Sequence, residues 1–220
     1  MLTRHSGIQG DRELAPGEAD AVTRGCGFDK AALGRAHGSF GANPMILGLF
    51  RNDPRAPLVD ALHRRVAAAA RAPALYARLG VPDTVEGRFE CLALHLVLVL
   101  RRLRRLPPPA RDVAQDLVDA FFRHLDASLR EMGVGDMRVP KRMKRLAQAF
   151  YGRAGSYDAA LDSADPARVA AALADPFGAA PEALSGLARY ALAAEAALAA
   201  DTLDALLERG PNLPPPARFA

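Results

Sequence analysis

Three aspartates share one face of a predicted helix and are the first residues whose spacing could support chemistry: Asp112, Asp116 and Asp119. Neighbouring carboxylates act as general acid and base when a desolvated pocket separates their pKa values. On this face, however, Arg123 follows Asp119 by four residues and Arg130 follows Asp126 by four, which is the favourable order for helical ion pairs. We therefore interpret the face as solvated ion pairs and not as a catalytic site.

Nucleophilic and metal chemistry have equally little support. The chain has no Gly-x-Ser-x-Gly elbow, and Cys26 and Cys91 fit neither a disulfide framework nor a zinc spacing. The histidines that could be considered lack metal-ligand spacing: His63, His95 and His124. His95 lies in an apolar helix, so we expect a hydrogen-bonded core residue; a haem or metal role would need a partner that the sequence does not identify. We predict no catalytic residue, metal or cofactor.

Helical signals dominate the chain, since alanine and leucine are abundant and tryptophan is absent. Helices are predicted over residues 57–71, 83–105, 110–132, from 140 onward, 166–174 and 181–208. Asp83 and Glu86 form a capping box at the start of the second helix, which is apolar on nearly all sides. We expect that helix to emerge into solvent at its terminal arginines, Arg101, Arg102, Arg104 and Arg105. The pattern predicts an all-α fold, a compact multi-helix domain around this central helix.

Composition divides the chain into three parts. Residues 1–43 are predicted to be a disordered arm, residues 44–210 a helical domain, and residues 211–220 a loose Pro-rich tail. Met45 opens an abrupt apolar stretch, so translation could begin there. No secretory or transit signal is recognised, and the longest apolar run is half of the roughly 20 residues needed to span a bilayer. These features favour a protein of a reducing, cytoplasmic compartment.

The charges are unevenly distributed. Residues 101–153 carry thirteen basic and six acidic side chains, whereas residues 154–220 carry four basic and nine acidic ones. A basic segment usually faces phosphates, anionic lipids or an acidic protein surface. A solvated helix face with internal ion pairs is the alternative interpretation.

Residues 129–144 form the least ordinary segment of the basic region. A short turn with Gly133 and Gly135 joins two amphipathic helices, and it should bring several charged side chains together: Arg130, Glu131, Asp136, Lys141 and Lys144. Loops held by a rigid scaffold often carry binding residues. The alternative is a capped helical corner with local ion pairs only.

Residues 121–161, which include this corner, resemble the signature region of the ubiquinol-cytochrome c chaperone family, and residues 75–104 resemble its bacterial branch. The resemblance implies a helical chaperone that binds newly made apocytochrome b and assists assembly of the cytochrome bc1 complex (respiratory chain complex III). It further implies candidate contact residues, namely Arg130, Glu131, Asp136, Lys141, Lys144, Arg153 and Tyr157, with Tyr151 lining an apolar groove.

Relatives act at the matrix face of the mitochondrial inner membrane with a small partner subunit. The equivalent place for a bacterial protein is the cytoplasmic face of the inner membrane, so an anionic membrane surface, the ribosome or a small assembly partner subunit are expected partners. Two other classes stay open: a basic helical RNA-binding protein and an enzyme acting on an apolar substrate. No helix-turn-helix pattern is visible, so DNA is not an expected partner.

Overall fold

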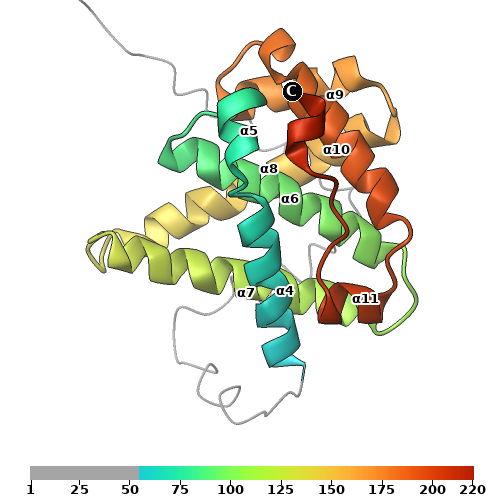
Figure 1. Ribbon diagram of the computed structural model, residues 1–220. Helices are drawn as coiled ribbons and strands as arrows, with labels where there is room; N and C mark the ends of the chain where they lie inside the picture. The colour runs from blue at the N-terminus through green and yellow to red at the C-terminus, as the bar shows by residue number, and fades with distance from the viewer. Residues whose placement is uncertain (1–54) are drawn as a thin grey trace, which may run out of the picture. The chain divides into compact units, whose positions relative to one another are not determined.

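Helix α6 (Val85–Arg104) is the centre of the fold and packs against five other helices: α4 (Ala56–Ala69), α7 (Ala110–Glu131), α8 (Val139–Asp162), α9 (Pro166–Phe177) and α10 (Ser185–Leu198). The computed structural model describes residues 55–220, and this part contains helices and no strand (Figure 1). Side chains of α6 are buried on nearly all sides between Cys91 and Arg101. The predicted all-α fold with a central apolar helix is confirmed.

The start of α6 differs by one residue from the predicted capping box. The Thr84 hydroxyl accepts a hydrogen bond from the Gly87 amide at 3.0 Å, so Thr84 is the N-cap. Asp83 instead forms an ion pair with Arg88 at 2.7 Å. A Cβ atom at position 87 would come within 2.1 Å of the Pro82 carbonyl oxygen, so only glycine fits where the incoming chain crosses this first turn.

Helices α7 and α8 form a hairpin around the predicted glycine turn. Gly133 adopts φ +76°, and its amide donates to the Arg130 carbonyl at 2.9 Å, which ends α7 as a left-handed cap. Pro140 lies in the first turn of α8, as predicted, and Val139 anchors that turn in the core with 1% of its surface exposed. The turn is therefore held by backbone hydrogen bonds and by one buried side chain.

The predicted helix over residues 181–208 is wrong as a continuous element. The chain forms a 3-10 turn η1 (Pro181–Leu184), then α10, and then a separate short helix α11 (Leu203–Glu208). Thr202 caps α11 by accepting from the Ala205 amide at 3.2 Å, and the Asp201 carboxylate accepts from the Asn212 amide at 2.8 Å. These polar side chains give the backbone an alternative to a helical ladder, and they end α10 at Leu198.

The Pro-rich tail was expected to be loose, but it packs on the body. Residues Pro216–Phe219 form a 3-10 turn η2 that lies against α10 and the short helix α5 (Pro73–Arg78), which was not predicted. The Phe219 ring contacts Tyr190 edge-on at a centroid distance of 5.8 Å, and its carbonyl accepts from Arg189. The Phe219 ring and its carbonyl oxygen therefore attach the tail to α10, although the prolines of the tail predicted a loose segment.

Several predictions lie outside the described residues. These are the disordered arm over residues 1–43, the domain start near residue 44, the translation start at Met45 and the environment of Cys26. Across residues 55–220, none of the helices has the length and apolar character needed to cross a bilayer.

Candidate functional site

The candidate site is the α7–α8 arm, which we define as residues 121–151. It comprises the second half of α7, the corner at residues 132–138 and the first half of α8 (Figure 1). Backbone hydrogen bonds brace the corner, from the Val134 amide to the Leu129 carbonyl at 3.1 Å and from the Arg138 amide to the Gly135 carbonyl at 2.8 Å. The predicted short, braced turn between two amphipathic helices is present.

Arg130 organises the acidic side of the corner. Its guanidinium binds Asp126 at 2.7 Å within α7 and Asp136 at 2.6 Å across the turn. The ion pair with Asp126 was predicted from the four-residue spacing and is confirmed. The equivalent pair between Asp119 and Arg123 is wrong, because Arg123 binds Asp60 of α4 at 2.8 Å instead.

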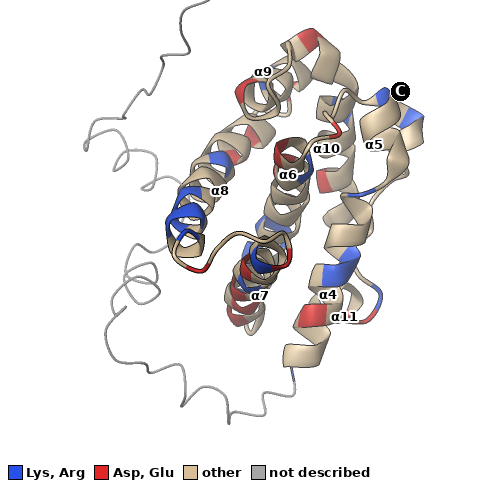
Figure 2. Ribbon diagram, turned by 90° about the vertical axis from the view of Figure 1, so that its left-hand side faces the viewer, with Lys and Arg blue, Asp and Glu red and all other residues tan. Residues whose placement is uncertain are grey.

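The first turns of α8 carry a cluster of exposed cations, which we call the cationic turns: Arg138, Lys141, Arg142, Lys144 and Arg145. Within residues 55–220, none of these side chains has an ion-pair partner, and Figure 2 shows their cationic colour gathered at this end of α8. From residue 137 to residue 157 the sequence has six cations and no Asp or Glu. Among the described residues, this end of the arm is therefore a positive surface without ion-pair partners.

Two methionines project from the corner beside these cations. Met137 is 94% exposed and Met132 is 56% exposed, and elsewhere in residues 55–220 the only comparably exposed large apolar side chains are Leu58 and Val85. Both methionines lie in the segment of residues 129–144, but neither was among the contact residues predicted from the sequence. The available signal was an apolar residue on each side of a Gly-x-Gly turn, where no core face exists to receive it.

Half-buried aromatic and aliphatic side chains run along the arm behind the corner: Phe122, Leu125, Met143, Leu146 and Tyr151. We call this set the apolar seam. The Phe122 ring lies 6.1 Å from Tyr151 and 5.8 Å from the buried Phe150, measured between centroids. The seam joins the core of the hairpin to its surface and includes Tyr151, whose place in a client-binding groove stays a prediction.

Arg153 and Tyr157 do not lie at the corner with the other candidate contact residues. Tyr157 is 2% exposed, and burial raises the pKa of its hydroxyl, for which residues 55–220 supply no hydrogen-bond partner. Arg153 forms an ion pair with Glu90 of α6 at 3.2 Å. Burial raises the pKa of Glu90, while Arg153 opposes that rise. These residues fasten α8 to α6, whereas Arg130, Glu131, Asp136, Lys141 and Lys144 are exposed.

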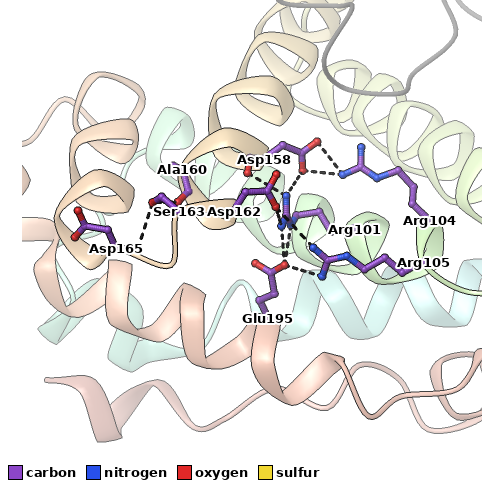
Figure 3. Close-up of polar contacts among 9 residues, drawn as sticks. All are labelled: Arg101, Arg104, Arg105, Asp158, Ala160, Asp162, Ser163, Asp165 and Glu195. Carbon is purple, nitrogen blue, oxygen red and sulfur yellow. Dashed lines mark hydrogen bonds and ion pairs between the residues drawn. The ribbon is translucent and has the colours of Figure 1, made fainter.

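The remaining arginines of the basic region are largely neutralised inside the fold. Arg101, expected in solvent, is 4% exposed and binds three carboxylates, Asp158 at 2.7 Å, Asp162 at 2.6 Å and Glu195 at 2.7 Å (Figure 3). Two flanking arginines join the same cluster, Arg104 on Asp158 and Arg105 on Glu195. The expectation was wrong because α8 and α10 bring the acidic C-terminal third of the chain over this end of α6.

His95 is a buried histidine with both ring nitrogens in hydrogen bonds. His95 Nδ1 lies 2.8 Å from the Cys91 carbonyl oxygen, so it carries the proton, and Nε2 accepts from the Tyr190 hydroxyl at 2.8 Å. Burial lowers the pKa of His95 to about 4, which keeps it neutral. The prediction of a hydrogen-bonded core histidine is confirmed. Over residues 55–220, no three His, Cys, Asp or Glu side chains gather in a way that could hold a metal ion.

This architecture is similar to that of known proteins. The family model of the ubiquinol-cytochrome C chaperone matches residues 77–213, a range that includes the whole arm. The crystal structure of the Cbp3 homolog from Brucella abortus is similar with a TM-score of 0.65 and 41% sequence identity, over 77% of this chain and 97% of that one. No curated protein matches the chain. The chain belongs to the ubiquinol-cytochrome C chaperone family.

Proposed function

We propose that the protein is an assembly chaperone that binds newly made cytochrome b through the α7–α8 arm and assists its entry into the cytochrome bc1 complex. The observation that carries this proposal is the contrast between the arm and the body. In the body, four arginines bind carboxylates of neighbouring helices: Arg101, Arg104, Arg105 and Arg153. The arm instead exposes two methionines, and five cations without an ion-pair partner among residues 55–220, beside a half-buried apolar seam. A folded protein keeps such groups exposed when a partner covers them.

The client's chemistry fits the two parts of the arm. Cytochrome b is an apolar membrane protein, so an unassembled segment presents aliphatic and aromatic side chains that the apolar seam and the methionines can cover. Methionine suits this role because its flexible thioether side chain adapts to many apolar shapes. Meanwhile the cationic turns supply long-range attraction, which speeds encounter more than it adds affinity.

Arg130, Glu131 and Asp136 are proposed to position the corner. The double ion pair of Arg130 links α7 to the turn at 2.7 Å and 2.6 Å, so it restrains the loop that carries Met132 and Met137. Arg153 and Tyr157 are proposed to act from inside, through the attachment of α8 to α6. A protein that only binds and releases a client needs no catalytic group, so we infer that it is not an enzyme.

The place of action is proposed to be the cytoplasmic face of the inner membrane, where a newly inserted cytochrome b can be reached. A ribosome or a small partner subunit could share the same surface. RNA binding is the alternative function that the cationic turns could serve. RNA binding has less support because the Phe122 and Tyr151 rings contact each other, with their centroids 6.1 Å apart, and so do not offer exposed ring faces on which bases could stack.

Charge reversal on the cationic turns tests the proposal. We expect the double variant Lys141→Glu/Lys144→Glu to fold normally, because both ammonium groups are exposed and have no ion-pair partner within residues 55–220. It should retain much less cytochrome b during affinity purification from cells and should fail to restore bc1 levels in a strain lacking the protein. Other respiratory complexes serve as the cellular control.

A matched control reverses two exposed arginines outside the arm, Arg168→Glu/Arg218→Glu, which changes the net charge by the same amount. This control variant should retain cytochrome b and restore the complex. Equal retention of cytochrome b by the arm variant and the control would contradict client binding at the arm. Normal bc1 levels in cells without the protein would contradict the whole proposal.

A further inference from the structure

The corner of the arm combines two properties that are rarely exposed together. Met137 is 94% exposed and Met132 is 56% exposed, while five cations follow within the cationic turns. Apolar side chains displayed among Lys and Arg are the composition of segments that lie in the interface of an anionic bilayer. We infer that the corner inserts its two methionines into an anionic lipid surface, independently of any client.

Charge complementarity supports a lipid surface as the occupant. The five exposed cations are Arg138, Lys141, Arg142, Lys144 and Arg145, and they have no ion-pair partner among the described residues. Of the two acidic side chains at the corner, Asp136 is bound to Arg130 at 2.6 Å, which leaves the exposed Glu131 against five cations. The corner therefore presents net positive charge to phosphate headgroups, each of which can accept hydrogen bonds from Lys and Arg.

The methionines discriminate between a bilayer and RNA. A nucleic acid offers phosphates and flat bases but no apolar phase, so an exposed aliphatic thioether gains little from it. A bilayer offers headgroup phosphates and acyl chains within one side-chain length of each other. Met137 is 94% exposed, and a Cβ atom at Gly133 or Gly135 would meet nothing within 4 Å. Among the described residues, none therefore crowds the two glycines of the turn or covers Met137.

The sequence offers a direct optical test, because the chain contains no tryptophan. Met137→Trp places a single tryptophan at the corner of the arm in the full-length protein. With vesicles of phosphatidylcholine and phosphatidylglycerol, its emission should shift to shorter wavelength and should be quenched by brominated acyl chains. Val85→Trp is the matched control, since Val85 is 56% exposed but lies outside the arm. Its emission should not change.

Vesicle sedimentation measures the contribution of the methionines. Met132→Ser/Met137→Ser should weaken binding to anionic vesicles about tenfold or more, because the variant lacks the two exposed apolar side chains that would enter the bilayer. Met132→Leu/Met137→Leu and Val85→Ser should bind as the wild type does. Vesicles of phosphatidylcholine alone should bind little, and added salt should weaken binding to the anionic ones.

Two results would overturn the inference: unchanged emission of Met137→Trp with anionic vesicles, or vesicle binding that is equal for the serine variant and the wild type. If the wild type and the serine variant bind polyuridylate equally well and neither binds vesicles, RNA is the partner instead. These measurements contain no cytochrome b, so they can fail while client binding stands. Conversely, loss of client binding would leave a positive vesicle result intact.

Discussion

Replacing Arg101 with methionine is the sharpest perturbation of the body, because one buried guanidinium binds three carboxylates there. Arg101 is 4% exposed and binds Asp158, Asp162 and Glu195 at 2.6–2.7 Å. Methionine keeps an unbranched apolar stem of similar length in the same channel. The variant therefore removes the charge while leaving most of the packing in place.

The expected loss in the free energy of unfolding depends on which partners the three carboxylates still have without Arg101. Breaking a buried ion pair by removing one partner typically costs about 3–5 kcal/mol. Asp158 still has Arg104 at 2.7 Å and Glu195 still has Arg105 at 2.9 Å, while the Asp162 side chain is 64% exposed and regains water. We therefore expect a loss of about 2–3 kcal/mol in the free energy of unfolding, below the full cost of stranding a buried charge.

Urea unfolding followed by circular dichroism measures this loss, with Arg88→Met as the control. Arg88 binds Asp83 at 2.7 Å, but both side chains are more than half exposed, at 57% and 60%. An exposed pair of this kind contributes less than about 1 kcal/mol. If Arg101→Met and Arg88→Met cost the same, then the cluster is not the clamp between α6, α8 and α10 that its geometry indicates.

The same cluster has a pH signature. The hydrogen bond from Arg101 holds the pKa of Asp162 below its usual 3.8. The stabilisation is thus present above the unfolded-state pKa and is lost as the pH falls through the lower folded-state pKa. Arg101→Met should remove this contribution, so its stability at neutral pH should fall more than its stability near pH 3, which unfolding at both values can test.

Three further outcomes are expected. Gly87→Ala should lower the free energy of unfolding by about 2–4 kcal/mol, since the new Cβ atom would lie 2.1 Å from the Pro82 carbonyl oxygen. Gly152→Ala is the control, because a Cβ atom there would meet nothing within 4 Å, and it should raise that free energy by about 0.5–1 kcal/mol. Thermal unfolding measures both changes. Phe219→Ala should lower the melting temperature through a loss of about 1–2 kcal/mol, because the ring covers Tyr190; an unchanged melting temperature would mean that the tail does not brace α10. Burial lowers the pKa of His63 to about 4, so stability should fall as the pH drops from 6.5 towards 4, and His63→Leu should flatten that slope in urea titrations at each pH.

Features set by local chemistry could be predicted from the sequence. Pro140 and Pro166 mark helix starts, and Gly133 marks a helix stop, because each acts on the backbone within one turn. The central helix was recognisable because its apolar residues cover the whole circumference, which only a buried helix tolerates. These signals need no knowledge of what packs against them.

Features set by long-range pairing could not be predicted. Arg101 resembles its neighbours in sequence, and its burial depends on Asp158 and Glu195, which lie 57 and 94 positions away. The break at Thr202 competes with a strong alanine-rich helical pattern, and it is decided by a cap and by the Asp201 contact with Asn212. Likewise Tyr157 and Lys141 belong to one signature segment, but α8 turns the first into the core and the second into solvent.

The division of charge along α8 connects stability to function. Its C-terminal half is bound to the body through Asp158 and Asp162, and its middle is bound through Arg153 to Glu90. Its N-terminal half carries the cationic turns. Because the middle and the C-terminal half of α8 are bound to the body, and because bending an α-helix strains its hydrogen-bond ladder, the start of α8 is held in place. Met132 and Met137 are therefore displayed on a braced corner, where the proposed partner would meet them.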